Sequence, residues 1–152
     1  MLLKTKLFAP PIRHNAIPRQ RLLHLLDQPA PARLTLIHAP AGYGKTTLAR
    51  QWLDQLPNPR AWLSLDAQDN DPARFWRYVS GALGLPAGTM APAPHGENDL
   101  EYWVVNLLNH WHQQEARLPT VLVLDDFHVI QDPELLQSVS WFLDRLPANR
   151  HV

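Results

Sequence analysis

A glycine-containing loop that ends in lysine and threonine is the part of this sequence best suited to chemistry. Residues 39–47 read Ala-Pro-Ala-Gly-Tyr-Gly-Lys-Thr-Thr. Backbone N–H groups can converge on a phosphate only where side chains are sparse, and Gly42 and Gly44 give the loop that freedom. The Lys45 ammonium would contact the β- and γ-phosphates of a nucleotide, and the Thr46 hydroxyl would coordinate Mg²⁺.

The sequence around the loop matches the strand–loop–helix context of a Walker A motif. An apolar run at 34–38 precedes the loop, and a helix-compatible segment follows it. The match is relaxed at Ala39, where the motif G-x-x-x-x-G-K-[ST] begins with glycine. The alternative is a glycine turn between a strand and a helix that ends in Gly-Lys-Thr by chance. The predicted cofactor-binding residues of the loop are Ala39, Pro40, Ala41, Gly42, Tyr43, Gly44, Lys45, Thr46 and Thr47.

A second motif supports the nucleotide interpretation. Four apolar residues, 121–124, run directly into Asp125 and Asp126. Such a run predicts a buried parallel strand whose carboxylates lie at its C-terminal edge, where ligands bind in open α/β sheets. Asp125 would hold Mg²⁺, and Asp126 could orient or deprotonate the attacking water. Asp126 and Lys45 are therefore the predicted catalytic residues. The alternative, an aspartate pair that only caps a strand end, is less favoured downstream of a phosphate loop.

Composition limits the remaining classes of function. The chain has 152 residues, a formal net charge of zero, no cysteine, and eight scattered histidines. These features predict one domain without disulfides, a metal cluster or a basic nucleic-acid face. The N-terminus lacks the apolar core of a signal peptide and no run is long enough to span a membrane, so the cytoplasm is expected.

Hydrophobic periodicity predicts alternating strands and helices. After a Pro-broken, extended lead-in over 1–18, the strands are expected at 33–38, 60–66 and 120–125, with another beginning at 149. The helices are expected at 19–27, 45–56, from Pro72, at 98–116 and from Pro133. This alternation favours an α/β fold with a right-handed parallel sheet. Residues 1–28 are predicted to form a lead-in with a short helix, and 29–152 a nucleotide-binding domain.

Six separated blocks resemble one known family in the same order. They are residues 5–7, 17–23, 39–47, 62–66, 69–72 and 124–128. The chain resembles the N-terminal region of the large ATP-binding regulators of the LuxR family, the group typified by the maltose regulon activator. That family commonly begins its loop Ala-Pro-Ala-Gly-Tyr-Gly-Lys, so the resemblance makes Ala39 part of a signature.

The resemblance implies a STAND-class P-loop NTPase with a three-layer αβα fold that binds ATP or ADP with Mg²⁺. It implies that Ile17 and Arg19 lie on the adenine side. ATP and an inducer would together promote self-association, slow hydrolysis would reset the switch, and DNA would be bound only through a C-terminal helix-turn-helix domain. In this family the strand expected after Asn149 lies between the two motif strands. The sheet is therefore expected to be incomplete at the fourth strand, with marginal stability and little or no ATP hydrolysis by residues 1–152 alone.

Two other functions remain open. A stand-alone P-loop enzyme, such as a small-molecule kinase, would need a lid with arginines, and the loop over 85–96 has none. A non-catalytic remnant would serve only as an interaction module and would bind no nucleotide.

Overall fold

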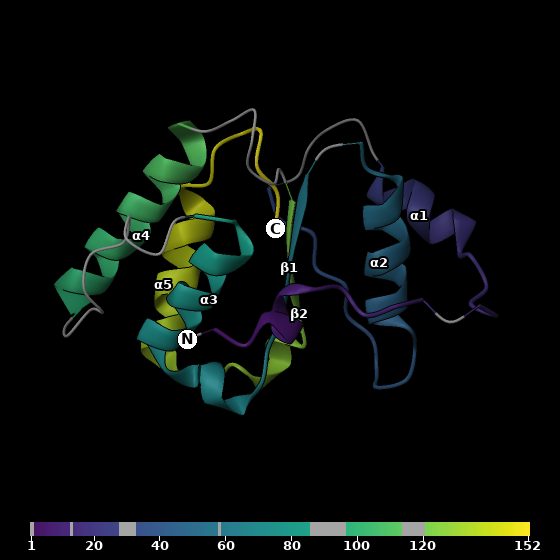
Figure 1. The fold of residues 1–152 in the computed structure, drawn as a ribbon, viewed down its shortest axis with the longest axis horizontal. Coiled ribbons are helices and arrows are strands. Elements are labelled where there is room, and N and C mark those ends of the chain that lie inside the picture. The colour runs from purple at the N-terminus through teal and green to yellow at the C-terminus, as the bar shows by residue number, and fades with distance from the viewer. Residues whose placement is uncertain (1, 13, 28–32, 58, 86–96, 114–120) are drawn as a thin grey trace.

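Two parallel strands lie between two groups of helices (Figure 1). The computed structural model describes residues 2–12, 14–27, 33–57, 59–85, 97–113 and 121–152. Strand β1 (Arg60–Ser64) pairs with β2 (Val121–Asp125) in a register that runs from Arg60 opposite Val121 to Ser64 opposite Asp125. The sheet thus joins segments that are far apart in the sequence, as a parallel pair with a helical crossover requires.

The helices form the two outer layers of an αβα arrangement. On one side lie α3 (Pro72–Ala82), α4 (Glu97–Gln113) and α5 (Pro133–Asp144), and on the other lie α1 (Gln20–Leu26) and α2 (Lys45–Gln55). Short 3₁₀ turns occur at η1 (Lys4–Leu7), η2 (Ala67–Asn70) and η3 (Phe127–Val129). The predicted α/β class with parallel strands is confirmed.

Alternate strand residues face the two layers. Ala61 and Leu63 belong to the apolar cluster under α3, α4 and α5, whereas Trp62 belongs to the cluster under α1 and α2. In β2, Leu122 belongs to the first of these clusters and Val121 to the second. Because both faces of the sheet are covered, the strands are continuous apolar runs instead of alternating polar and apolar ones.

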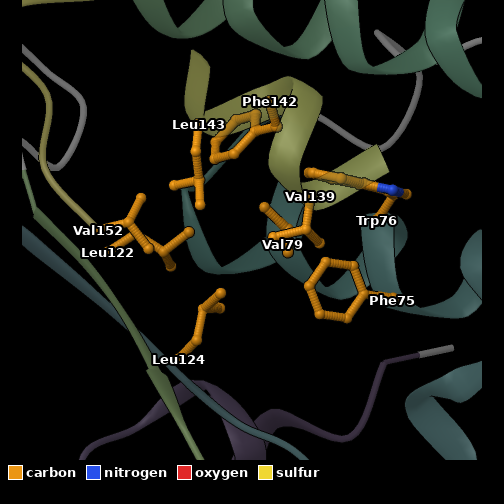
Figure 2. A pocket seen from close by; sticks show the side chains of 9 residues that line it. All are labelled: Phe75, Trp76, Val79, Leu122, Leu124, Val139, Phe142, Leu143 and Val152. Carbon is orange, nitrogen blue, oxygen red and sulfur yellow. The ribbon is translucent and has the colours of Figure 1, made fainter. Parts of the chain in front are cut away.

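The larger cluster is closely packed against the sheet. Figure 2 shows Leu122 and Leu124 of β2 facing side chains of α3 and α5, and the cavity among these groups is only about 10 Å³. The Phe142 ring lies 5.1 Å from that of Trp76, edge to face, and 6.1 Å from that of Trp111, nearly parallel. These aromatic contacts join all three helices of this layer.

Two helices begin at the Asp-Pro pairs that the sequence indicates. The Asp71 carboxylate accepts a hydrogen bond from the Arg74 amide at 2.6 Å. The Asp132 carboxylate accepts one from the Leu135 amide at 2.8 Å. In each case proline follows as the first helical residue, where its missing N–H costs no hydrogen bond.

The strand predicted over 33–38 is not part of the sheet, and that prediction is wrong. Among the described residues, the backbone of this segment is paired with Val152 alone, and a single partner residue does not make a strand. The Val152 amide donates to the Arg33 carbonyl at 2.9 Å, and the Thr35 amide donates to the Val152 carbonyl at 2.9 Å. On the other side, His151 forms an isolated parallel bridge with Val121. Residues 151–152 therefore lie between 33–35 and β2, which is the place predicted for the strand expected after Asn149.

The other predicted elements form close to their expected bounds. The helices predicted at 19–27, 45–56 and from Pro72 and Pro133 are confirmed, and so are the strands at 60–66 and 120–125, each slightly shorter. Helix α4 covers the described part of the segment predicted at 98–116, whose last residues lie outside the described ranges.

The N-terminal segment is more structured than the extended lead-in that its prolines predict. Turn η1 packs on β1 and α3, and the side chain of Lys6 is buried. The Lys6 ammonium donates to Asp66 at 3.0 Å and also to Asp69, which is completely buried. Arg74 donates to the second oxygen of Asp69 at 2.9 Å. The hydrogen bond from Lys6 holds the pKa of Asp66 below its usual range. A charged network therefore fastens the N-terminus to the edge of the sheet.

Replacement of Lys6 by methionine is expected to destabilise the fold by about 3 kcal/mol, because it removes one of the two cationic partners that the buried Asp69 has among the described residues. Urea unfolding followed by tryptophan fluorescence measures the change. Lys4→Met is the matched control, since Lys4 lies in the same turn but is exposed. Equal unfolding midpoints for the two variants would contradict this role of Lys6.

Candidate nucleotide-binding site

The glycine loop (residues 39–47) adopts backbone angles that only glycine accepts easily. Gly42 has φ 83° and Gly44 has φ 76°, both in the left-handed region. Gly44 is also the N-terminal cap of α2, and its carbonyl accepts the hydrogen bond from the Leu48 amide at 2.9 Å. The loop thus turns directly into the N-terminus of α2, whose partial positive charge favours an anion.

Lys45 lies across the glycine loop. Its Nζ donates to the carbonyl of Ala39 at 2.9 Å and to that of Pro40 at 3.1 Å. The ammonium is therefore held at the mouth of the loop by weak, neutral acceptors. A phosphate oxygen placed there would offer a charged acceptor, which forms a stronger hydrogen bond than a carbonyl.

Thr46 connects the glycine loop to the second motif. Its hydroxyl donates to the Asp125 carboxylate, with Oγ1 at 2.9 Å from Oδ1 and 3.2 Å from Oδ2. Asp125 is the last residue of β2, so the loop and the strand end meet at the carboxyl edge of the sheet. The two residues that the sequence predicts as metal ligands are brought into direct contact.

Asp125 is in an environment that disfavours its charge. Burial raises the pKa of its carboxyl above the usual value, and repulsion by Asp126 acts in the same direction, while the bond from Thr46 opposes both. The positive charge of Lys45 also lowers this pKa, but less than burial raises it, so the charge of the carboxylate is only partly compensated. A divalent cation bound beside Thr46 would supply the missing positive charge.

Asp126 has an unusual backbone. With φ 59° it is the non-glycine residue with positive φ among those that the structure describes. A left-handed conformation at a residue with a side chain costs energy and is often found at functional sites. It turns the chain sharply after β2, and the carboxylate is half exposed at the same edge as Lys45.

His128 lies next to the site, although the sequence did not predict it as a site residue. Its Nδ1 lies 3.8 Å from Asp126 Oδ1, and its side chain is largely exposed. In the sequence His128 follows Asp126 by two residues, which alone does not indicate a contact. The 3₁₀ turn η3 brings the two side chains close together.

The segment predicted to lie on the adenine side is partly next to the glycine loop. A Cβ atom at Gly44 would lie 3.4 Å from Arg19 Nη2, so the guanidinium rests on the loop backbone. Ile17 is 83% exposed, and Tyr43 in the loop is 60% exposed. The structure thus brings Arg19 to the loop, and Ile17 lies nearby in sequence with a free apolar surface.

Comparison with known proteins identifies this arrangement. The family model described as AAA domain matches residues 29–151. The chain belongs to the AAA domain family. A nucleotide-binding site at the glycine loop agrees with this AAA domain.

Three relatives carry the printed name HTH-type transcriptional regulator MalT. The protein from Vibrio cholerae is 36% identical over 155 residues, which cover 98% of this chain and 17% of the relative. The one from Serratia proteamaculans is 37% identical over 158 residues, covering 98% and 17%. The one from Vibrio parahaemolyticus is 36% identical over 158 residues, covering 100% and 17%. The AAA domain chain thus spans about 17% of the length of these relatives, and the family resemblance predicted from the six sequence blocks is confirmed.

Replacement of Asp125 by asparagine is expected to stabilise the fold at neutral pH. A raised pKa means that the folded state prefers the protonated carboxyl, so ionisation of Asp125 removes stability as the pH rises above the ordinary value of 3.8. Asparagine keeps an acceptor for Thr46 without the charge. Unfolding midpoints should therefore differ at pH 7 and converge below pH ~4.

The control for net charge is Asp144→Asn, since Asp144 is exposed at the end of α5. If D125N were less stable than the parent at pH 7, the burial of an only partly compensated charge at Asp125 would be refuted.

Proposed function

We propose that this AAA domain binds ATP or ADP with Mg²⁺ and serves as the nucleotide-binding part of a transcriptional regulator of the LuxR family. The observation that carries the proposal is the contact between Thr46 and Asp125, which joins the glycine loop to the end of β2. Loop and carboxylate are thereby placed on the two sides of one site at the N-terminus of α2.

Three features of the glycine loop suit phosphate binding. The left-handed glycines Gly42 and Gly44 allow the loop to curve so that its N–H groups can converge on a phosphate. Lys45 already points to the loop, so it needs only to exchange carbonyl partners for phosphate oxygens. These groups would bind the phosphates of a nucleotide and would not distinguish its base or its sugar.

The metal chemistry fits Mg²⁺ in particular. Among the described residues no group of three or more His, Asp or Glu side chains could hold a metal ion by itself. Mg²⁺ in nucleotide sites takes only one or two protein ligands and completes its shell with phosphate oxygens and waters. Thr46 and Asp125 are such a pair, and the bound ion would neutralise the developing charge on the phosphates.

Asp126 is placed to hold a water for hydrolysis. It follows Asp125 directly, and its carboxylate is half exposed after the sharp turn at φ 59°. We propose that Asp126 orients or deprotonates this water, with Lys45 stabilising charge on the phosphate side. His128, 3.8 Å from Asp126, is placed to influence the charge of that carboxylate.

Base recognition is assigned to the segment before α1. The Arg19 guanidinium rests against Gly44 and can stack on a purine or contact its phosphates, while the exposed Ile17 offers an apolar surface to the ring. This segment is fixed by the hydrogen bonds from the Leu22 and Leu23 amides to the Arg19 carbonyl.

A regulatory role rests on the relatives, which are named as HTH-type transcriptional regulators. We propose that nucleotide binding here promotes self-association, and that DNA is bound by a separate helix-turn-helix domain in the cytoplasm. The formal net charge of zero suits a domain that does not itself hold nucleic acid. Among the described residues, no helix has the length and apolarity needed to cross a membrane.

Calorimetric titration with ATP and Mg²⁺ tests the nucleotide proposal. Lys45→Ala is expected to weaken binding at least about tenfold, because it removes a charged hydrogen-bond donor from the phosphates. Lys4→Ala, which removes an exposed lysine outside the glycine loop, is the control and should bind as the parent does.

Asp125→Asn should leave ATP binding without Mg²⁺ nearly unchanged and abolish the gain that Mg²⁺ brings. Absence of any nucleotide binding by the parent protein would instead favour a non-catalytic interaction module. Rapid phosphate transfer to a small molecule would favour a kinase.

A further inference from the structure

The turns that follow the two strands lie at the same edge of the sheet (Figure 1). Turn η3 begins directly after Asp126, so its conformation decides where that carboxylate lies. Turn η2 ends at Asn70, which belongs to the sequence block 69–72 and has no role yet in the proposed site. The contact between the two turns shows what this asparagine does.

The side-chain amide of Asn70 joins the two turns. Its Nδ2 donates to the Val129 carbonyl at 2.8 Å and to the Ala67 carbonyl at 3.1 Å. Its Oδ1 accepts from the Gln131 amide at 2.7 Å and from the Asp132 amide at 3.0 Å. Both donor and both acceptor positions of the amide are thus occupied, and three of the four bonds cross from η2 to the chain that follows β2.

This set of bonds requires a carboxamide at position 70. An aspartate could accept from the Gln131 and Asp132 amides, but it would place a negative oxygen against the Val129 carbonyl. An aliphatic side chain could make none of the bonds. The contact therefore depends on the one chemical group that can donate and accept at the same time in a short side chain.

Turn η2 gives Asn70 a fixed support. The Asp66 carboxylate accepts from the Gln68 amide at 2.9 Å, and the Asp69 carboxylate accepts from the Asp66 amide at 2.9 Å. These reciprocal bonds form a capping box around the turn. The same two carboxylates are held by the buried charged network described above. Because η2 is fixed from η1 and α3, it can restrain the turn beside it.

Val129 connects this restraint to Asp126. Its amide donates to the Asp126 carbonyl at 3.1 Å, while its own carbonyl accepts from Asn70. Asp126 has φ 59°, a conformation that persists in a residue with a side chain only where surrounding contacts hold it. The Asp126 carboxylate does not itself cap η3, so the turn is held from its other end, at Val129.

We propose that Asn70 is a positioning residue of the nucleotide site. By holding Val129, it keeps Asp126 in the left-handed conformation and its carboxylate at the edge of the sheet where Lys45 lies. The inference rests on the function proposed above for Asp126, and adds the group that fixes its place. Without the bond to Val129, the strained backbone can relax to ordinary angles and the carboxylate moves from the position of the water.

NMR of the full chain without nucleotide tests the proposal with Asn70→Ala and Asn70→Asp. At positive φ the amide and α protons of one residue lie closer together than at negative φ, so Asp126 gives a strong NOE between them. Both variants should lose this strong NOE. Both should also speed exchange of the Val129 amide at least about tenfold, because the turn that protects it opens more often.

The Gln131 and Asp132 amides distinguish the two variants. Their exchange should rise in N70A, which removes their acceptor, and should stay slow in N70D, whose carboxylate still accepts from both. Loss of the Asp126 NOE in N70D would therefore show that the bond to Val129 is the decisive one.

Ser138→Ala is the control for a general loss of stability. It removes the acceptor of the hydrogen bond that Trp76 donates at 3.0 Å, between α3 and α5, and should leave Asp126 and Val129 unchanged. An Asp126 NOE and a Val129 exchange rate that stay as in the parent in N70A and N70D would overturn the proposal, and so would equal changes in S138A. Both signals are recorded without nucleotide, so they decide the role of Asn70 separately from nucleotide binding.

Discussion

The hydrogen bond between Thr46 and Asp125 is the contact on which the arrangement of the site depends. Thr46 belongs to α2, which packs in the smaller apolar cluster, whereas Asp125 ends β2, whose side chains divide between the two clusters. Since residues 33–38 do not pair with β2, few backbone bonds link the glycine loop to this strand. The side-chain bond, the packing of α2 and the two residues His151 and Val152 together set the distance between lysine and carboxylate.

Asp125 therefore serves two opposed requirements. The fold favours its protonated form, because burial and the neighbouring Asp126 raise its pKa. Metal binding requires the carboxylate. The ionised Asp125 therefore lowers the stability of the fold at neutral pH. Binding of Mg²⁺ to this carboxylate would restore that stability. The left-handed Asp126 beside it is a second local cost at the same place.

Local signals predicted most of the fold. Both motifs, the Asp-Pro helix starts and the apolar helix faces depend on neighbouring residues, so they can be read from the sequence. Two features depend on partners distant in sequence and were missed. The segment 33–38 has the composition of a strand, but whether it joins a sheet depends on backbone partners such as Val152, far away in the sequence. Lys6 is buried because it pairs with Asp66 and Asp69, which follow β1 and lie about sixty residues later in the sequence. The position of Arg19 against Gly44 likewise needs the tertiary fold.

In the proposed function, one metal ion lies between the glycine loop and the end of β2. Mn²⁺ can replace Mg²⁺ and broadens NMR signals of nearby amides. With ATP and Mn²⁺ together, the account predicts strong broadening at Gly44, Thr46 and Asp125, and none at Trp76 or Leu135, which are buried in the layer of α3 and α5. Broadening confined to exposed carboxylates elsewhere, with the signals of Thr46 and Asp125 unaffected, would contradict it.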